Sequence, residues 1–206
     1  MSLYNNKNLL EAGVDEVARG CLAGPVYAAA VIWPNDEDML DPSIKLKDSK
    51  KLSKEKRSFL KDYIEEYAID FAVASVDNNE IDEINILQAS QLAMRKAIAK
   101  LDVQPESLLI DGNYFKPYVD GKGELIPHEC FVKGDDKFQS ISAASILAKV
   151  YHDEYIENLV KSETSLEKYD WQSNMCYGTK KHIEAIKEFG ITKYHRKTFG
   201  ICKEYL

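Results

Sequence analysis

Hydrophobic and polar positions in the first third of the chain follow the periods of strands and then of a helix. Residues 9–15 and 25–33 are short apolar runs rich in valine, alanine and isoleucine, with a glycine-bearing turn between them. Residues 67–76 alternate apolar and polar side chains. The three runs predict a meander of strands that begins with a hairpin. Residues 53–67 place apolar side chains at helical spacing, and Ser53 is the expected N-cap of that helix.

The pattern then changes to an alternation of helices and strands. From Asn79 an apolar stripe at helical spacing predicts a long amphipathic helix that ends before Pro105. Residues 108–110 are a short, fully apolar run typical of a buried parallel strand, and residues 128–132 predict a fifth strand. Residues 140–159 predict another helix. This order of elements indicates an α/β fold, with a mixed sheet flanked by helices.

The 206 residues fit one domain with a small appendage, because a single core serves up to roughly 250 residues. We expect residues 1–160 to form the main domain. Residues 161–206 should form a small helical subdomain, in which residues 181–189 are the clearest helix.

Composition is that of an ordinary soluble protein, with 45% hydrophobic and 30% charged residues. The longest apolar stretch, residues 26–33, is far shorter than the ~20 residues that cross a bilayer, and no signal peptide precedes it. We therefore expect a cytoplasmic protein with no membrane partner. The four cysteines lie far apart without a Cys-x-x-Cys pair, so we expect reduced thiols rather than a zinc or redox motif.

The net charge of −7 argues against a nucleic-acid partner, because phosphate binding usually leaves a basic footprint. Lysine and arginine nevertheless concentrate in two islands, residues 45–61 and residues 180–197. The first contains Lys50 and Lys51, and the second contains Arg196. Each island fits either a solvated helix face or a phosphate-binding surface, and composition alone favours the solvated face.

Acidic residues stand where three apolar strand runs end. Asp15 and Glu16 end the first run, Asp111 follows the fully apolar run, and Asp135 follows the fifth predicted strand after a Lys-Gly pair. In open α/β sheets the carboxyl ends of neighbouring strands form the crevice where ligands bind, so these carboxylates can meet. An aspartate after a strand is also an ordinary turn residue, and that alternative stays open for each of them.

Four carboxylates that meet cannot all stay ionised without cations, because mutual repulsion raises their pKa values. Oxygen ligands favour Mg²⁺ or Mn²⁺ over zinc. Two such ions ~3.5–4 Å apart would stabilise both the attacking and the leaving oxygen of a phosphodiester displacement. One difficulty is that neighbouring residues of a strand point to opposite faces. Asp15 and Glu16 can serve one pair of ions only if the strand ends or bulges there, or if Glu16 reaches around the edge.

Several segments, in order along nearly the whole chain, resemble the ribonuclease HII family. The matching segments are AGVDEVARG at 12–20, LAGPV at 22–26, AAAV at 28–31, DSKKLS at 48–53, NIL at 85–87, DGN at 111–113, VKGD at 132–135, SAASILAKV at 142–150, YGT at 177–179 with His182, and His195-Arg196. Together they are highly specific, whereas any one of them alone is weak.

The resemblance implies a ribonuclease H-like fold with a five-stranded mixed sheet and a C-terminal helical part that helps to hold a duplex. It implies that Asp15, Glu16, Asp111 and Asp135 bind Mg²⁺ or Mn²⁺ and carry catalysis. The implied reaction is two-metal hydrolysis on the 5′ side of a ribonucleotide, in RNA/DNA hybrids or in DNA with embedded ribonucleotides. It leaves a 3′-hydroxyl and a 5′-phosphate. We expect a monomer.

The family reads the 2′-hydroxyl, which distinguishes RNA from DNA, with a Gly-Arg-Gly loop and a tyrosine. These match Ala18-Arg19-Gly20 and Tyr177 in this sequence. The resemblance also makes Lys50 and Lys51 phosphate contacts.

Two of the family's glycines are replaced, one in the loop by Ala18 and one before the tyrosine by Cys176. With a positive φ, Ala18 would strain the loop or hold the ribose away from the metals; with a negative φ it would be harmless. We expect harm, so that Ala18→Gly would cleave a single embedded ribonucleotide several-fold faster.

Three rival functions are less well supported by the sequence. A ribonuclease HIII-like enzyme shares the metal site but carries an extra N-terminal domain, whereas this chain reaches its first catalytic strand by Asp15. A catalytically weak or idle RNA/DNA-junction-binding relative fits the lost glycines but leaves four mutually repelling carboxylates unexplained. A nucleotide-binding α/β protein should have a Gly-x-x-x-x-Gly-Lys-Ser phosphate loop, which the sequence lacks.

Overall fold

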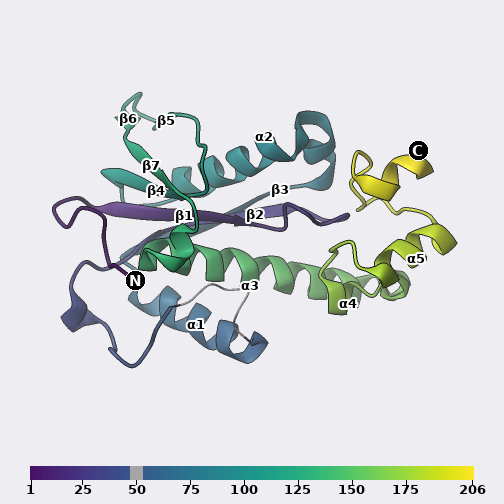
Figure 1. The fold of residues 1–206 in the computed structure, drawn as a ribbon, viewed down its shortest axis with the longest axis horizontal. Helices are drawn as coiled ribbons and strands as arrows, with labels where there is room; N and C mark the ends of the chain where they lie inside the picture. The colour runs from purple at the N-terminus through teal and green to yellow at the C-terminus, as the bar shows by residue number, and fades with distance from the viewer. Residues whose placement is uncertain (47–52) are drawn as a thin grey trace.

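A computed structural model describes residues 1–46 and 53–206, with a five-stranded mixed sheet at its centre (Figure 1). Three strands pair antiparallel: β1 (Glu11–Val17), β2 (Val26–Ile32) and β3 (Asp70–Val76). Two shorter strands run parallel to β1: β4 (Ser107–Asp111) and β7 (His128–Phe131). The order across the sheet is β3-β2-β1-β4-β7, which confirms the predicted α/β fold.

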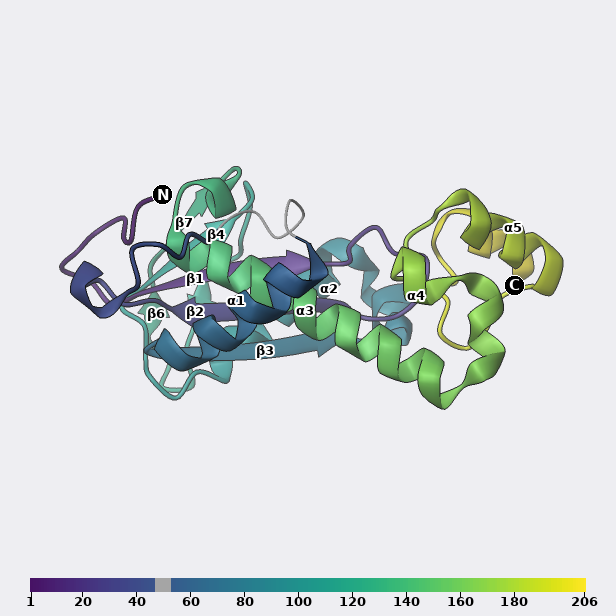
Figure 2. The same cartoon turned by 90° about the horizontal axis from the view of Figure 1, so that it is seen from below.

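Helices cover both faces of this sheet. α2 (Asn78–Ala99) packs on one face, and α3 (Gln139–Ser162) lies along the other with α1 (Lys54–Tyr67) beside it (Figures 1 and 2). Gly13 in β1 permits the close approach of α3, because a Cβ at this position would lie 2.2 Å from the carbonyl carbon of Ser140. This contact fixes α3 against the strand that carries the first two candidate carboxylates.

Local hydrogen bonds explain where the helices begin. Ser53 caps α1 as predicted, its side chain accepting from the Lys56 N–H. Asp77 caps α2 in the same way. Asn85 interrupts α2 with a φ of +67°, and its side chain accepts from the next free N–H groups, so the helix restarts after it. Asparagine tolerates this left-handed backbone because its short side chain can bond locally.

Two features differ from the pattern expected from the sequence. β1 continues to Val17, so Asp15 and Glu16 lie within the strand rather than at its end. A small hairpin of β5 (Tyr118–Val119) and β6 (Leu125–Ile126) precedes β7 and was not expected. Strands of two residues are too short to show a hydrophobic period, which is why the pattern misses them.

The residues after α3 form short helical segments grouped beyond one end of the sheet (Figure 2). They are η4 (Thr164–Tyr169), α4 (Trp171–Asn174), α5 (Lys180–Phe189) and η5 (Gly200–Tyr205). α5 confirms the helix predicted over residues 181–189. Among the described residues before α3, η1 (Glu37–Met39) and η3 (Gly134–Asp136) are 3-10 helices.

All four cysteines are free thiols, as expected. Burial raises the pKa of the Cys21 thiol to about 12 and that of the Cys202 thiol to about 11, so both behave as small apolar core residues. Across residues 1–46 and 53–206, no helix has the length and apolar character needed to span a membrane.

Candidate active site

The predicted carboxylates lie near the level at which the pairing of β1 with β4 ends. β1 and β4 are parallel and their pairing stops at Val14 and Ile110, so Asp15 and Asp111 follow the last paired residues. Asp111 is also the last residue of β4 that pairs with β7, and η3 places Asp135 shortly after β7. The sheet therefore brings three separate stretches of the sequence to one edge.

Asp15 is the most enclosed of these groups. It is 6% exposed, and its carboxylate hydrogen-bonds the Ser145 hydroxyl on α3. Its Oδ1 also accepts from the Glu16 N–H at 2.7 Å. Burial raises the pKa of Asp15 well above its usual value, and the negative charges of Glu16 and Asp111 raise it further. The three carboxylates are thus close enough to repel one another.

Glu16 interacts electrostatically with both Asp15 and Asp111. β1 pairs regularly with β2 on both sides of Glu16, without a bulge, so its side chain leaves the opposite face from Asp15. β4 has ended at this level, which leaves the edge open. Arg19 Nη1 binds Glu16 Oε1 at 2.9 Å. Burial raises the pKa of Glu16, the positive charge of Arg19 opposes this increase, and Asp111 adds to it.

Gly134 makes room for the remaining two carboxylates. Its N–H donates to Asp111 Oδ1 at 2.7 Å. A Cβ on Gly134 would lie 2.6 Å from Ile141 Cδ1 and 3.3 Å from the same Asp111 oxygen, so a side chain would push this turn away. Asp135 is the next residue and is 9% exposed.

The carboxylates lie near the same edge of the sheet, but they are not arranged around a common metal position. Within the described part of the chain, no three histidine, cysteine, aspartate or glutamate side chains are grouped closely enough to hold a metal ion as they stand. The donors are all oxygens, which suit Mg²⁺ or Mn²⁺. The raised pKa values of Asp15 and Glu16 reflect a charge conflict that a divalent cation would relieve. An open set of this kind suits Mg²⁺, which often takes one or two carboxylates together with substrate phosphates.

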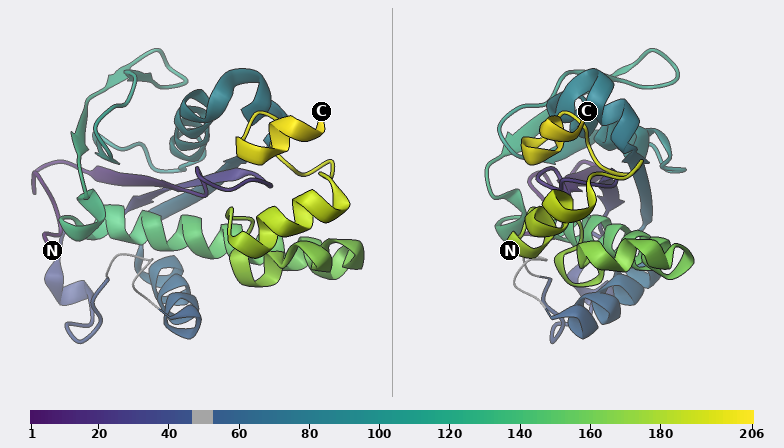
Figure 3. Two further views of the ribbon diagram at one scale, coloured as in Figure 1. Left: turned by 45° about the vertical axis from the view of Figure 1, so that its right-hand side comes forward. Right: turned by 90° about the vertical axis from the view of Figure 1, so that its right-hand side faces the viewer.

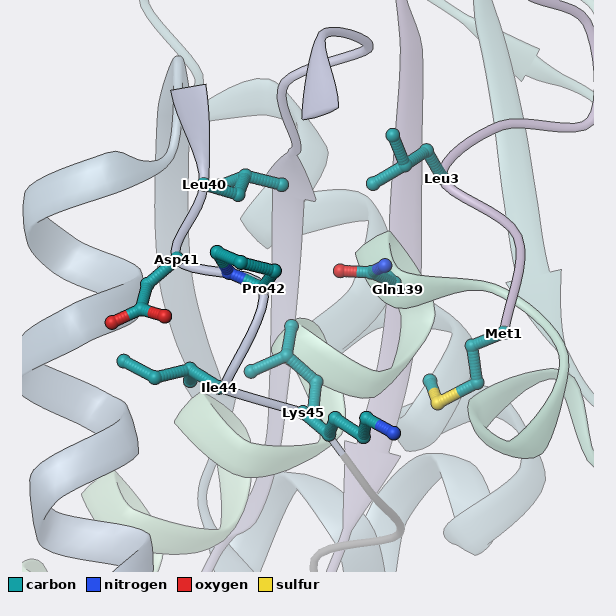
Figure 4. A pocket seen from close by; sticks show the side chains of 9 residues that line it. Met1, Leu3, Leu40, Asp41, Pro42, Ile44, Lys45 and Gln139 are labelled. Carbon is teal, nitrogen blue, oxygen red and sulfur yellow. The ribbon is translucent and has the colours of Figure 1, made fainter. Parts of the chain in front are cut away.

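A cavity of about 410 Å³ lies elsewhere in the molecule (Figure 4). Its lining is mostly apolar and comes from the N-terminal segment, residues 40–46 and Gln139 at the start of α3. None of the four carboxylates lines it. The candidate active site is therefore the strand edge rather than this cavity.

The loop after β1 contains the residues expected to read the substrate. Ala18 has a φ of +70°, which excludes the harmless negative-φ alternative. Its side chain is 2% exposed and belongs to the core beneath the loop, so the methyl group points into the protein. Ala18 therefore strains the loop, by about 1 kcal/mol, without obstructing a ligand. Arg19 and Gly20 are exposed.

Tyr177 packs against this loop. Cys21 and Tyr177 form an antiparallel bridge, and the Tyr177 ring lies 4.0 Å from the position of a Cβ on Gly20. The phenol hydroxyl faces the Ala18 N–H and the Cys21 thiol. Burial raises the pKa of Tyr177, so its phenol stays neutral. The structure thus brings Tyr177 and the predicted loop together, whereas the predicted phosphate contacts Lys50 and Lys51 lie outside the described residues.

Arg196 is a supporting residue whose place the sequence does not reveal. It belongs to the second basic island, for which a solvated or phosphate-binding surface was expected, but its side chain is fully buried. Its Nε donates to the Gly24 carbonyl at 2.9 Å, and its Nη1 donates to the Arg19 carbonyl at 3.0 Å. Arg196 therefore holds both ends of residues 18–25, the connection between β1 and β2, which we call the substrate loop after its expected role. The match of His195-Arg196 to a family motif is the sequence signal that points to this role.

Comparisons with known proteins find relatives over nearly the whole chain. A family model described as Ribonuclease HII matches residues 12–202. A Ribonuclease HII from Christiangramia forsetii is 50% identical over 206 residues, which are 100% of this chain and 98% of the relative.

Solved structures show the same fold. The ribonuclease H2 from Pyrococcus horikoshii OT3 has a TM-score of 0.74 and 25% identity, covering 95% of this chain and 96% of that chain. Bst-RNase HIII, solved in complex with Mn²⁺, has a TM-score of 0.69 and 21% identity, covering 95% of this chain and 68% of that chain. The family model and the Christiangramia relative both match nearly the whole of this chain.

Proposed function

Because the chain belongs to the ribonuclease HII family of metal-dependent endoribonucleases, we propose that it cuts on the 5′ side of a ribonucleotide in RNA/DNA hybrids or in DNA with embedded ribonucleotides. The cut leaves a 3′-hydroxyl and a 5′-phosphate. The observation that carries this proposal is the meeting of Tyr177 with the Ala18-Arg19-Gly20 loop beside the carboxylate edge. Arg19 connects the two, because it lies in the loop and binds Glu16.

We propose that Asp15, Glu16, Asp111 and Asp135 hold the catalytic Mg²⁺ or Mn²⁺ ions. The oxygen-only donor set and the raised pKa values of Asp15 and Glu16 support this assignment. The Mn²⁺ complex of Bst-RNase HIII supports it as well. When bound, divalent ions at such a site stabilise the negative charge that develops on the reacting phosphate. The Gly134 N–H keeps Asp111 oriented for this role.

We assign the reading of the ribose to Ala18, Arg19, Gly20 and Tyr177. Selectivity requires a contact with the 2′-hydroxyl, and the neutral Tyr177 phenol beside an exposed stretch of backbone offers both a donor and an acceptor. Lys50 and Lys51 would bind phosphates, which position a duplex without reading it. Residues 161–206 would act as the subdomain that holds the duplex against residues 1–160.

The test is incubation with a labelled duplex that contains one embedded ribonucleotide, in Mg²⁺, in Mn²⁺ and in a chelator. An all-DNA duplex of the same sequence is the control. We expect a single cut 5′ of the ribonucleotide with either metal and none with the chelator. Cutting of the all-DNA control, or cutting in the chelator, would contradict the proposal.

A catalytically weak or idle junction-binding relative is the second candidate. Backbone strain at Ala18 and Cys176, with φ of +70° and +66°, favours it because both residues lie in the parts that would read substrate. In the same experiment this candidate predicts a retained gel shift on the ribonucleotide duplex with no cleavage in either metal.

We further propose that the enzyme works in the cytoplasm as a monomer. The four free thiols support a reducing compartment. Light scattering on the purified protein should give the mass of one chain, and a dimer mass would overturn the second part of this proposal.

A further inference from the structure

The substrate loop is held between two segments of the C-terminal part. On one side, the Cys176 carbonyl accepts from the Leu22 N–H at 2.8 Å. On the other, the Tyr194 carbonyl accepts from the Gly24 N–H at 2.9 Å. Figure 3 shows these C-terminal segments beside the turn between β1 and β2. The position of Tyr177 relative to the loop therefore depends on how its own segment is held.

That segment is strained immediately before the tyrosine. Met175 and Cys176 both have left-handed backbone, with φ of +47° and +66°. Each such residue costs about 1–2 kcal/mol relative to an ordinary conformation. Two consecutive strained residues persist only where surrounding contacts fix them. The Asn174 side chain supplies one such contact, since its Oδ1 accepts from the Cys176 N–H at 2.9 Å.

A second contact comes from a pair of buried histidines. His195 Nδ1 accepts from the Thr192 N–H at 2.9 Å, so its proton is on Nε2. This Nε2 lies 3.2 Å from His182 Nε2, which also accepts from Trp171 Nε1 at 2.9 Å. His182 must therefore carry its proton on Nδ1, which lies 3.0 Å from the Tyr177 carbonyl oxygen and donates to it. The hydrogen bonds leave one tautomer for each ring.

Burying these two imidazoles costs desolvation free energy, which apolar core residues would not. Both imidazoles are fully buried, and aromatic rings of Tyr169 and Trp171 pack around them. Apolar side chains would fill the same volume without a desolvation cost. Hydrogen-bonded polar networks instead restrict the geometry. Trp171 and His195 share the one lone pair of His182 Nε2. Here His182 Nδ1–H donates from the histidine pair to the main-chain carbonyl of Tyr177.

We propose that His182 is a positioning residue for ribonucleotide selectivity: its Nδ1–H holds the Tyr177 main chain, and hence the phenol, against the Ala18-Arg19-Gly20 loop. His182 does not touch the substrate. The inference rests on the proposed role of Tyr177 as a reader of the ribose. It goes beyond that role because it assigns the selectivity of the site to a buried group in the C-terminal part.

Two substitutions separate the two ends of the His182 ring. In His182→Asn, the amide nitrogen stands near the Nδ1 position and can still donate to Tyr177. In His182→Gln, the amide reaches the Nε2 position and can still accept from Trp171 and His195, but the bond to Tyr177 is lost. Both variants disturb the same buried network, so each controls for the loss of stability in the other.

The measurement is the single-turnover cleavage rate on a duplex with one ribonucleotide and on a long RNA/DNA hybrid, with the melting temperature of each variant. We expect His182→Gln to lower the rate on the single ribonucleotide by about tenfold relative to the hybrid, because small misplacements are expensive for rate. His182→Asn should keep the native ratio of the two rates. Equal loss of the ratio in both variants, or no change in His182→Gln, would overturn the inference.

The selectivity of the native enzyme separates a failure of the positioning role from a failure of the proposed function. If it shows no preference for ribonucleotide over all-DNA duplex, the proposed function and the role of His182 fail together. If it is selective and His182→Gln is equally selective, the positioning role alone fails. Should His182→Gln not fold, ¹⁵N spectra of the native histidine rings give a second measurement. A proton on Nδ1 of His182 is expected, and a proton on Nε2 would contradict the inference.

Discussion

Ala18 and Cys176 occupy the two positions at which the ribonuclease HII pattern has glycine, and both have left-handed backbone. Glycine adopts this conformation without a steric penalty, whereas a residue with a Cβ is strained by about 1 kcal/mol. Both side chains are buried, so the penalty is strain in the segments proposed to read the substrate and not obstruction of the ribose. The sequence identifies the two unusual residues, but only the backbone angles distinguish strain from a harmless change.

Ala18→Gly should relieve the backbone strain at residue 18 and thereby raise the cleavage rate. We predict cleavage of a single embedded ribonucleotide up to about fivefold faster, which corresponds to about 1 kcal/mol. The gain on long RNA stretches should be smaller, because they offer more positions for engagement. Single-turnover rates on both substrates test this, since product release does not then mask the step. Ala23→Gly is the control, because it removes a buried methyl group from the same loop, where φ is not positive. Equal rates for native enzyme and Ala18→Gly would show that the strain is tolerated.

The buried histidines make the fold sensitive to acid. Burial and the neighbouring His182 lower the pKa of His195 to about 3, whereas the unfolded chain should titrate near 6.5. Below pH 6.5 the unfolded state binds a proton that the folded state excludes. The stability contributed by the neutral ring is therefore complete above pH 6.5 and is lost as the pH falls toward 3.

We predict that His195 alone lowers the free energy of unfolding by about 2 kcal/mol between pH 7 and pH 5. Urea denaturation of native protein and of His195→Asn in a chelator measures this difference. Asparagine can accept from the Thr192 N–H but cannot be protonated, so the variant should lose less stability over the same interval. Parallel pH profiles for the two proteins would contradict the prediction.

At the scale of elements, the hydrophobic pattern predicts the five strands of the sheet, as short apolar runs or by alternation. It predicts the helices α1, α2, α3 and α5 because each is long enough to show the helical period. It does not predict β5 and β6, although the Asp120-Gly121 pair between them is a recognisable turn signal. It also misses the break at Asn85, since one left-handed residue leaves the apolar stripe unchanged. β1 continues through Glu16 because it pairs with β2 there, and the hydrophobic pattern of β1 alone does not predict that pairing.

Gly13 tests the packing of α3 on β1. We predict that Gly13→Ala destabilises the protein by about 3 kcal/mol or prevents folding, because the new Cβ would lie 2.2 Å and 2.3 Å from backbone atoms of Ser140 and Ile141. Displacing α3 should also reduce cleavage by misplacing Ser145 relative to Asp15. Gly121→Ala is the control, since its Cβ meets nothing within 4 Å. Thermal denaturation of both variants decides, and a native melting temperature for Gly13→Ala would be inconsistent with the packing described.

For the whole molecule, a net charge of −7 is a poor guide to its partner, because charge acts locally. The count of basic residues also misleads in detail, since Arg196 is enclosed beneath the substrate loop. The closeness of Asp15 and Asp111 follows from the parallel pairing of β1 with β4, which the alternation of elements predicts in outline. Closure of these carboxylates around ions does not follow from the sequence, and the described residues do not show it.

The most direct test of the account is the single-turnover rate of Asp111→Asn on a duplex with one ribonucleotide in Mg²⁺. We predict a loss of several orders of magnitude, because the site loses charge needed to hold ions at the reacting phosphate. Stability of the metal-free protein should be unchanged or higher, since repulsion of Asp15 and Glu16 is relieved. Asp136→Asn, next to the assigned Asp135, is the matched control and should cleave at nearly the native rate. A near-native rate for Asp111→Asn would contradict the assignment of this strand edge as the catalytic metal site.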